Sequence, residues 1–132
     1  MKTTLSSMFA LACVYATSVA LAASPVGLWK TIDDETGRER SFIRIIVAGD
    51  TIEGTIEDII SFPGDDPEQL CRDCEGSLKD QPVIGMKIMW GLYGGGASWK
   101  DGYIMDPNNG KTYRCKLTVE TDDQSMRVRG YS

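Results

Sequence analysis

Residues of alternating polarity make up much of this sequence. From Lys111 to Val119, polar residues alternate with Tyr, Cys, Leu and Val, which is the period of a β-strand with one buried face. The segment from Thr51 to Phe62 begins with the same period of two. After Pro25, no stretch longer than ten residues has the period of an amphipathic helix. The chain is therefore constrained to fold mainly as β-sheet.

Turn-forming residues separate the alternating segments at short intervals. Gly49-Asp50, Gly94-Gly95-Gly96 and the segment from Asp106 to Gly110 carry the Gly, Pro, Asn and Asp residues that turns favour. Seven strands are predicted between the turns: Gly27–Ile32, Arg40–Ala48, Thr51–Phe62, Val83–Leu92, Ser98–Met105, Lys111–Val119 and Ser125–Tyr131. The inward face predicted for the fourth strand consists of Ile84, Met86, Ile88, Trp90 and Leu92.

The predicted fold class is all-β, an antiparallel meander that curls into a barrel. Closure into a barrel removes the exposed edges that a long flat sheet would leave. Glycines inside the predicted strands support this curvature, because glycine in a strand commonly marks a bend or a close approach. They are Gly54, Gly85, Gly91, Gly102 and Gly130. A sandwich of two sheets is the alternative architecture.

The first 22 residues are predicted to be a secretory signal peptide rather than part of the fold. Lys2 precedes an apolar run, and the small-residue motif Ala20-Leu21-Ala22 places cleavage near Ala22 or Ala23. Residues 23–132 then form a single β-barrel domain, and no later segment could span a membrane. The expected location is periplasmic or secreted.

The charge balance narrows the classes of partner. Lys2 is the one charged residue among residues 1–22, so 13 of the 14 Lys and Arg residues remain against 19 Asp and Glu, a net charge of −6. This balance argues against nucleic acid as a partner and disfavours a peripheral grip on anionic lipid. The chain has no His, and it has neither a G-x-S-x-G turn nor a phosphate loop. A non-enzymatic protein without a cofactor is expected.

The C-x-x-C pair Cys71 and Cys74 lies in a long acidic loop between the third and fourth predicted strands. In an exported protein such a pair is expected to form a disulfide, and Cys115 is a further candidate partner for either residue. A thiol-disulfide role is the alternative, but Asp73 and Glu75 disfavour the thiolate. Metal binding is a weaker alternative, because a structural zinc site normally has four Cys or His ligands. No metal site is predicted.

Two further groups of residues are candidates for a site. Lys79, Asp80 and Gln81 precede Pro82 and could form a polar patch at the mouth of the barrel, although a plain junction between loop and strand is favoured. Aromatic residues on the fourth and fifth predicted strands could line a ligand site, although core packing is the commoner role of such residues. They are Trp90, Tyr93, Trp99 and Tyr103.

Two resemblances to known families rest on particular motifs. Gly27-Leu28-Trp29, at the start of the first strand, is similar to the G-x-W signature of lipocalin-like (calycin) proteins, in which the Trp closes one end of the barrel. A set of longer segments resembles the bacterial envelope family known as domain of unknown function 2147. The segments are "GLWKT", "CRDCEGSLKDQPVIGMKIMWGL", "GYIMDPNNGKTYRCKLTV" and "MRVRGY".

The family resemblance implies an exported, lipocalin-like β-barrel with no established activity. Because members of the family usually continue beyond the "RGY" segment with a further strand, the resemblance implies one of three cases: a truncated sequence, an open barrel of seven strands, or a partner that supplies the missing edge. Together these observations predict a protein that binds a small or apolar ligand or an envelope partner. A barrel filled by its own side chains, with no ligand, is the alternative interior.

Overall fold

The computed structural model describes residues 23–122 and 125–132, so the predicted signal peptide lies outside the described residues. These residues form a seven-stranded antiparallel sheet in which each strand pairs with the next one in sequence. The strands are β2 (Gly27–Ile32), β3 (Glu39–Ala48), β4 (Thr51–Ile59), β5 (Lys87–Gly95), β6 (Ser98–Asp106), β7 (Lys111–Val119) and β8 (Met126–Tyr131). A 3₁₀-helix, η1 (Gly76–Leu78), lies between β4 and β5.

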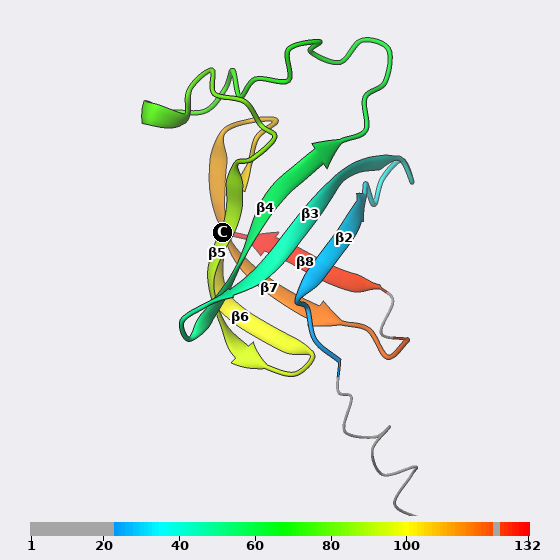
Figure 1. The fold of residues 1–132 in the computed structure, drawn as a ribbon, viewed down its shortest axis with the longest axis vertical. Helices are drawn as coiled ribbons and strands as arrows, with labels where there is room; N and C mark the ends of the chain where they lie inside the picture. The colour runs from blue at the N-terminus through cyan, green and yellow to red at the C-terminus, as the bar shows by residue number, and fades with distance from the viewer. Residues whose placement is uncertain (1–22, 123–124) are drawn as a thin grey trace, which may run out of the picture.

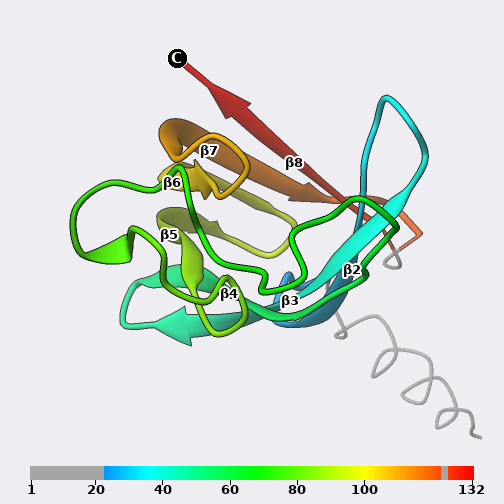
Figure 2. The ribbon, with the colours of Figure 1, turned by 90° about the horizontal axis from the view of Figure 1, so that it is seen from above.

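The sheet curls into a half-barrel whose two edges are β2 and β8 (Figure 1). The long connection from β4 to β5, residues 60–86, lies over one end of the half-barrel, as the view from above shows (Figure 2). We call this segment the disulfide loop and the end that it covers the loop end. The predicted all-β antiparallel meander is confirmed.

The predicted strand boundaries agree with the structure to within one residue, except at the end of the third strand, where β4 stops at Ile59 rather than Phe62, and in the fourth strand. Prediction placed that strand at Val83–Leu92, whereas β5 begins at Lys87. The backbone of Val83 to Met86 forms a turn instead, in which the N–H of Met86 donates to the carbonyl of Val83 over 3.1 Å. Ile84 consequently lies outside the sheet and is 41% exposed.

The predicted inward face of β5 is also wrong at Trp90. Met89 pairs with Gly54 on β4 and is buried, so it takes the inward position. Trp90 pairs with Tyr103, and Tyr103 pairs with Arg114 on the outer face of the sheet. Gly91 then adopts a left-handed φ of 73°, which reverses the alternation and turns Leu92 inward. Ile88 also faces the interior, and the register shift between Gly54 and Thr55 on β4 marks a second irregularity beside it; strict alternation could show neither one.

Two clusters of buried side chains hold the half-barrel together. The first cluster consists of Ile45, Ile52, Met89, Leu92, Cys115, Leu117 and Val119, with Trp29 packed against it. The second cluster includes residues of the disulfide loop and consists of Ile56, Cys71, Cys74, Val83, Met86, Ile88 and Met105. Burial of each large aliphatic side chain contributes roughly 1.5–3 kcal/mol. The second cluster therefore fastens the loop to the sheet.

Candidate ligand-binding site

An open pocket of about 480 Å³, which we call the interior cavity, lies on the inner side of the half-barrel. Apolar side chains from four neighbouring strands line its wall: Ile43, Ile56, Ile88, Ile104 and Met105. The remaining lining residues come from the ends of β2 and β3, from the β6–β7 turn and from β7 and β8. They are Thr31, Ile32, Asp33, Arg40, Ser41, Asp106, Pro107, Asn108, Tyr113 and Gly130. The volume lies within the usual range of small-molecule sites.

The strand register explains how the apolar wall forms. Ile43 on β3 pairs with Ile56 on β4, and Ile104 on β6 pairs with Tyr113 on β7. Side chains of directly paired residues point to the same face of a sheet, so each pair contributes two neighbouring side chains to the interior. The wall is thus a direct product of the alternation along the strands.

Polar groups gather at the rim of the cavity. Asp33 accepts hydrogen bonds from the backbone N–H groups of Glu35 (2.8 Å) and Thr36 (3.1 Å). These bonds, with a smaller contribution from the Arg40 cation, lower the pKa of Asp33 below its usual range. The hydroxyl groups of Thr31 and Ser41 are 2.7 Å apart and hydrogen-bonded. The rim thus offers both charges and hydroxyl groups beside an apolar wall.

The Cys71–Cys74 disulfide, one of the predicted pairings, is confirmed. Both residues are buried, and their Cα atoms are 5.4 Å apart. The sulfur of Cys71 lies 3.7 Å from the carbonyl oxygen of Pro107, and the sulfur of Cys74 lies 3.8 Å from that of Met105. The disulfide therefore packs directly against the residues that begin the β6–β7 turn.

A glycine in the β6–β7 turn permits this close packing. Gly110 has a left-handed φ of 73°, and a Cβ atom there would overlap the carbonyl oxygen of Asp73. The N–H of Gly110 donates to the carbonyl of Asp106 over 2.7 Å and closes the turn. Because Pro107 and Asn108 line the interior cavity, the disulfide loop supports part of the cavity rim.

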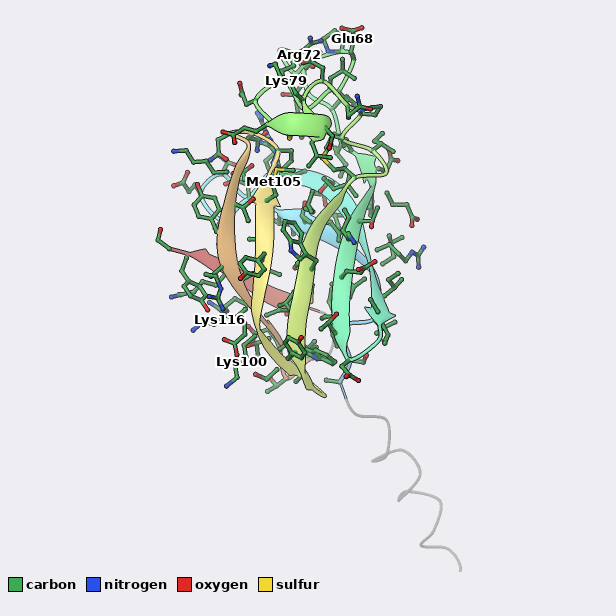
Figure 3. All side chains as sticks on the ribbon, turned by 90° about the vertical axis from the view of Figure 1, so that its left-hand side faces the viewer. Glu68, Arg72, Lys79, Lys100, Met105 and Lys116 are labelled. Atoms are coloured by element: carbon green, nitrogen blue, oxygen red, sulfur yellow. A yellow bond between two sulfur atoms is a disulfide. The ribbon has the colours of Figure 1, made fainter. Side chains whose placement is uncertain are left out.

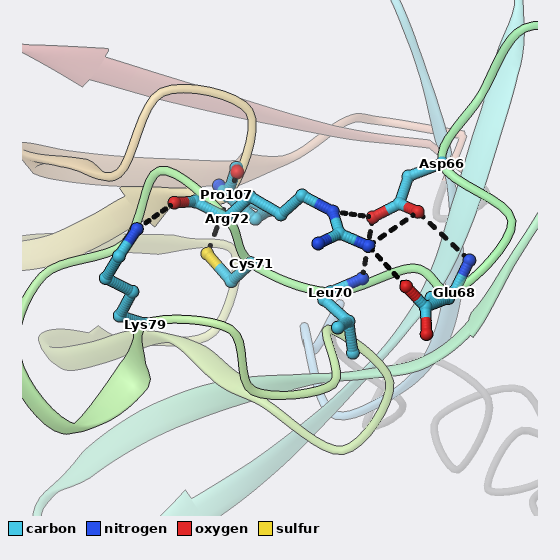
Figure 4. Close-up of polar contacts among 7 residues, drawn as sticks. All are labelled: Asp66, Glu68, Leu70, Cys71, Arg72, Lys79 and Pro107. Carbon is cyan, nitrogen blue, oxygen red and sulfur yellow. Dashed lines mark hydrogen bonds and ion pairs between the residues drawn. The ribbon is translucent and has the colours of Figure 1, made fainter.

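Arg72 binds the acidic residues of the disulfide loop rather than the cystine (Figure 4). Its Nε donates to Asp66 over 2.8 Å, and one of its terminal nitrogens donates to Glu68 over 2.6 Å. The hydrogen bond from Arg72 is the main cause that lowers the pKa of Asp66 to about 2. With its guanidinium engaged in this way, Arg72 gives little support to a thiolate at Cys71 or Cys74.

The predicted polar junction contributes mainly to the fold of the loop. Lys79 donates from Nζ to the carbonyl of Arg72 over 2.8 Å. Asp80 donates its backbone N–H to the carbonyl of Cys71, whose own N–H donates to the carbonyl of Gln81. All three predicted residues lie away from the interior cavity.

The four predicted aromatic residues also lie outside the lining of the interior cavity. Trp90 stacks on Tyr103 with ring centroids 6.0 Å apart, and Tyr93 is 56% exposed. Trp99 packs against the first cluster, and its indole N–H donates to the carbonyl of Gly96 over 3.0 Å. Tyr113 lines the cavity instead, and its inward place in the alternation of β7 was the signal for it.

A second hollow lies on the outside of the sheet, between the disulfide loop and β5. This outer groove has a volume of about 710 Å³ and, like the interior cavity, is open to solvent. Its walls include Leu78, Pro82 and Ile84 from the loop and Lys87 and Trp90 from β5. Trp90, predicted as a ligand-lining residue, thus borders a hollow different from the interior cavity.

Cys115 is a buried free cysteine in the first cluster. Desolvation raises the pKa of its thiol to about 11, which leaves it protonated at neutral pH. Within residues 23–122 and 125–132, no group of three or more Cys, Asp or Glu side chains is arranged to hold a metal ion.

Comparison with known protein families assigns the chain to one of them. The model of a family described as "Uncharacterized protein conserved in bacteria (DUF2147)" matches residues 27–132. The chain belongs to the DUF2147 family. Among solved structures, this DUF2147 chain is similar to protein HP1028 from the human pathogen Helicobacter pylori, described as a member of the lipocalin family. The match has a TM-score of 0.66 at 15% sequence identity and covers 80% of this chain and 70% of HP1028.

The comparisons confirm the predicted family and the lipocalin-like fold of this DUF2147 chain. At 15% identity, the likeness to HP1028 concerns the fold alone. No curated protein matches the sequence. In the described part of the chain, no helix is long and apolar enough to cross a membrane.

Proposed function

We propose that this protein is an exported, non-enzymatic binding protein that holds a small, largely apolar ligand in the interior cavity. The observation that carries the proposal is the cavity itself, because its wall consists of Ile and Met side chains while its rim is polar. Small-molecule sites typically combine an apolar lining with a few oriented polar groups. The lipocalin-like fold adds support by analogy.

The residues around the cavity suggest the chemistry of the ligand. The apolar part would lie against Ile43, Ile56 and Ile104, where burial contributes roughly 25 cal/mol per Å² of apolar surface. A polar head group would lie at the rim near Arg40, which can donate hydrogen bonds, and near Tyr113. An amphipathic molecule such as a short fatty acid fits both requirements.

A displacement assay with a fluorescent fatty acid tests the proposal. Ile32, which lines the rim and is 58% exposed, can be replaced with little cost in folding. We expect Ile32→Trp to obstruct the cavity and to weaken binding tenfold or more, about 1.4 kcal/mol. Val47→Trp is the matched control, because Val47 is 59% exposed on β3 but lies outside the cavity lining. Absence of saturable binding by the unmodified protein would sink the proposal.

The predicted alternative, a thiol-disulfide or metal-binding protein, has less support. The sulfurs of Cys71 and Cys74 are in the second buried cluster, where an attacking thiol has poor access. An envelope partner remains the second candidate, and it would be favoured if the cavity took up no probe.

A further inference from the structure

The outer face of β6, β7 and β8 carries a group of cationic side chains. On β7 the buried residues Cys115, Leu117 and Val119 face inward, so the alternating Arg114 and Lys116 face outward. The register places Arg129 opposite Lys116 and Arg127 opposite Thr118. Lys100 projects near Lys116, away from the disulfide loop (Figure 3). The basic face is defined as Lys100, Arg114, Lys116, Arg127 and Arg129.

One cross-strand pair in the basic face is unfavourable for folding. Lys116 and Arg129 are direct partners on β7 and β8 and carry the same charge. Like charges directly opposite each other destabilise a sheet. Neither residue, nor Lys100, forms an ion pair with any residue that the structure describes. A bound anionic partner would relieve this repulsion, which the fold alone does not.

Aromatic side chains lie beside the cations on the same face. The guanidinium of Arg114 lies 5.1 Å from the centre of the Tyr103 ring, and Tyr103 stacks on Trp90. Tyr131 pairs with Arg114 on the other side, and Tyr93 pairs with Lys100. The three tyrosines are between 38% and 56% exposed. Cations and amphipathic aromatic rings therefore share one surface.

Two cations of the basic face have acidic partners, Arg114 with Asp101 at 3.9 Å and Arg127 with Glu120 at 3.0 Å, but the densest group of acidic residues lies elsewhere. Residues 63–80 of the disulfide loop contain six Asp and Glu residues against two basic ones. Glu68 in that loop and the two lysines of the basic face lie toward opposite ends of the molecule (Figure 3). The net charge of the chain, −5, averages over these unlike regions. It therefore does not describe the charge that a partner at the basic face would meet.

We propose that the basic face docks on an anionic lipid surface. Lys and Arg side chains are attracted to anionic head groups, and Tyr and Trp favour the level of the head groups. The mixture of exposed tyrosines with the cations favours a lipid surface over a soluble polyanion, which needs only the charges. β8 also carries Gly130 in the cavity lining, so docking would bring one border of the cavity to the membrane. The docking surface does not depend on the proposed ligand.

Vesicle sedimentation tests this surface. The probe is phosphatidylcholine vesicles with and without phosphatidylglycerol, and the whole chain is used, so residues 1–22 contribute equally in every variant. We expect binding to require phosphatidylglycerol and to fall with added salt. Lys116→Gln with Arg129→Gln should lower the partition coefficient roughly 25-fold, about fivefold per charge. The same double variant should unfold at an equal or higher temperature, because the like-charge pair is gone.

The control removes the same charge from another part of the sheet. Lys30→Gln with Arg44→Gln changes two residues on β2 and β3 that are ion-paired with Glu39 and Glu57. We expect this variant to change the partition coefficient less than twofold. Equal losses in the two double variants would overturn the proposal, as would binding that is indifferent to phosphatidylglycerol. Binding to polyphosphate but not to vesicles would also overturn it, in favour of a soluble polyanion.

Discussion

The interior of the half-barrel is packed differently toward its two ends, although the same strands build both. Away from the loop end, in what we call the filled half, the side chains of the first cluster fill the interior. They include Ile45, Ile52 and Leu92, none of which is exposed. Around Ile43 and Ile104, the same alternation leaves a cavity. There the second cluster, which includes residues of the disulfide loop, packs along one side of the cavity and leaves the other side open. A single meander can therefore contain a filled core and an open site.

The largest expected effect tests whether the two halves differ in packing. Leu117→Ala in the filled half should lower the free energy of unfolding by about 2–5 kcal/mol, because Leu117 is 1% exposed. Ile104→Ala beside the cavity should cost less than about 2 kcal/mol, since part of its surroundings is already empty. Urea unfolding of both variants measures the difference. Equal costs would mean that the two halves are packed alike.

The second prediction concerns the support of the loop end. Replacing both cysteines, Cys71→Ser with Cys74→Ser, should lower the free energy of unfolding by about 2 kcal/mol, as expected for a cross-link that closes a very short loop. It should also weaken probe binding, because Pro107 at the rim loses its contact with Cys71. Thermal unfolding and probe displacement measure the two effects. The reduced natural protein is the control and should behave like the double variant; unchanged probe affinity would separate the loop from the cavity.

A smaller effect, on the local stability of the disulfide loop, should depend on pH. Asp66 has a folded pKa of about 2, below its ordinary value of 3.8, so it stabilises the loop above about pH 4, and that contribution is lost as the pH falls toward 2. The N–H groups of Glu68 and Leu70, which donate to Asp66, should then exchange faster with deuterium. Asp66→Asn should remove this pH dependence. Protection that stays constant from pH 5 to pH 2 would contradict the role of Asp66.

The smallest expected effect concerns the reactivity of the Cys115 thiol rather than the stability of the protein. Cys115 in the filled half should react with an alkylating reagent far more slowly than an exposed thiol, because burial raises its pKa to about 11. Intact-mass measurement of the native, non-reduced protein should show little labelling. Labelling should reach one thiol for residues 23–132 when the protein is unfolded without reductant. Rapid native labelling would show that the filled half opens readily.

The local pattern of residues was sufficient to predict most strands of the sheet but not the candidate ligand-binding site. The boundaries of β2 and β7 were predicted correctly, because alternation and flanking turns are properties of adjacent residues. The start of β5 was not, since the turn at Val83 to Met86 depends on hydrogen bonds with Ile56 on another strand. The cavity could not be predicted either, because Arg40 and Tyr113 meet there only through the curl of the sheet.

The cysteine pairing illustrates the same limit. Three cysteines after residue 22 left several pairings open, and the sequence could not decide between Cys74 and Cys115 as the partner of Cys71. The structure decides it by position: Cys115 is in the first cluster, whereas Cys71 and Cys74 are in the second. Only the three-dimensional arrangement separates these two clusters.

The meander order of the strands has a consequence for how the chain folds. Each strand pairs with the strand that precedes or follows it, and the disulfide joins residues three positions apart. The contact order of the sheet is therefore low for an all-β protein, and loop closure costs little entropy at each step. A chain that emerges from its N-terminus, from a ribosome or through a membrane pore, can add one hairpin at a time to the growing sheet. The residues of β8, with the cations of the basic face, join last.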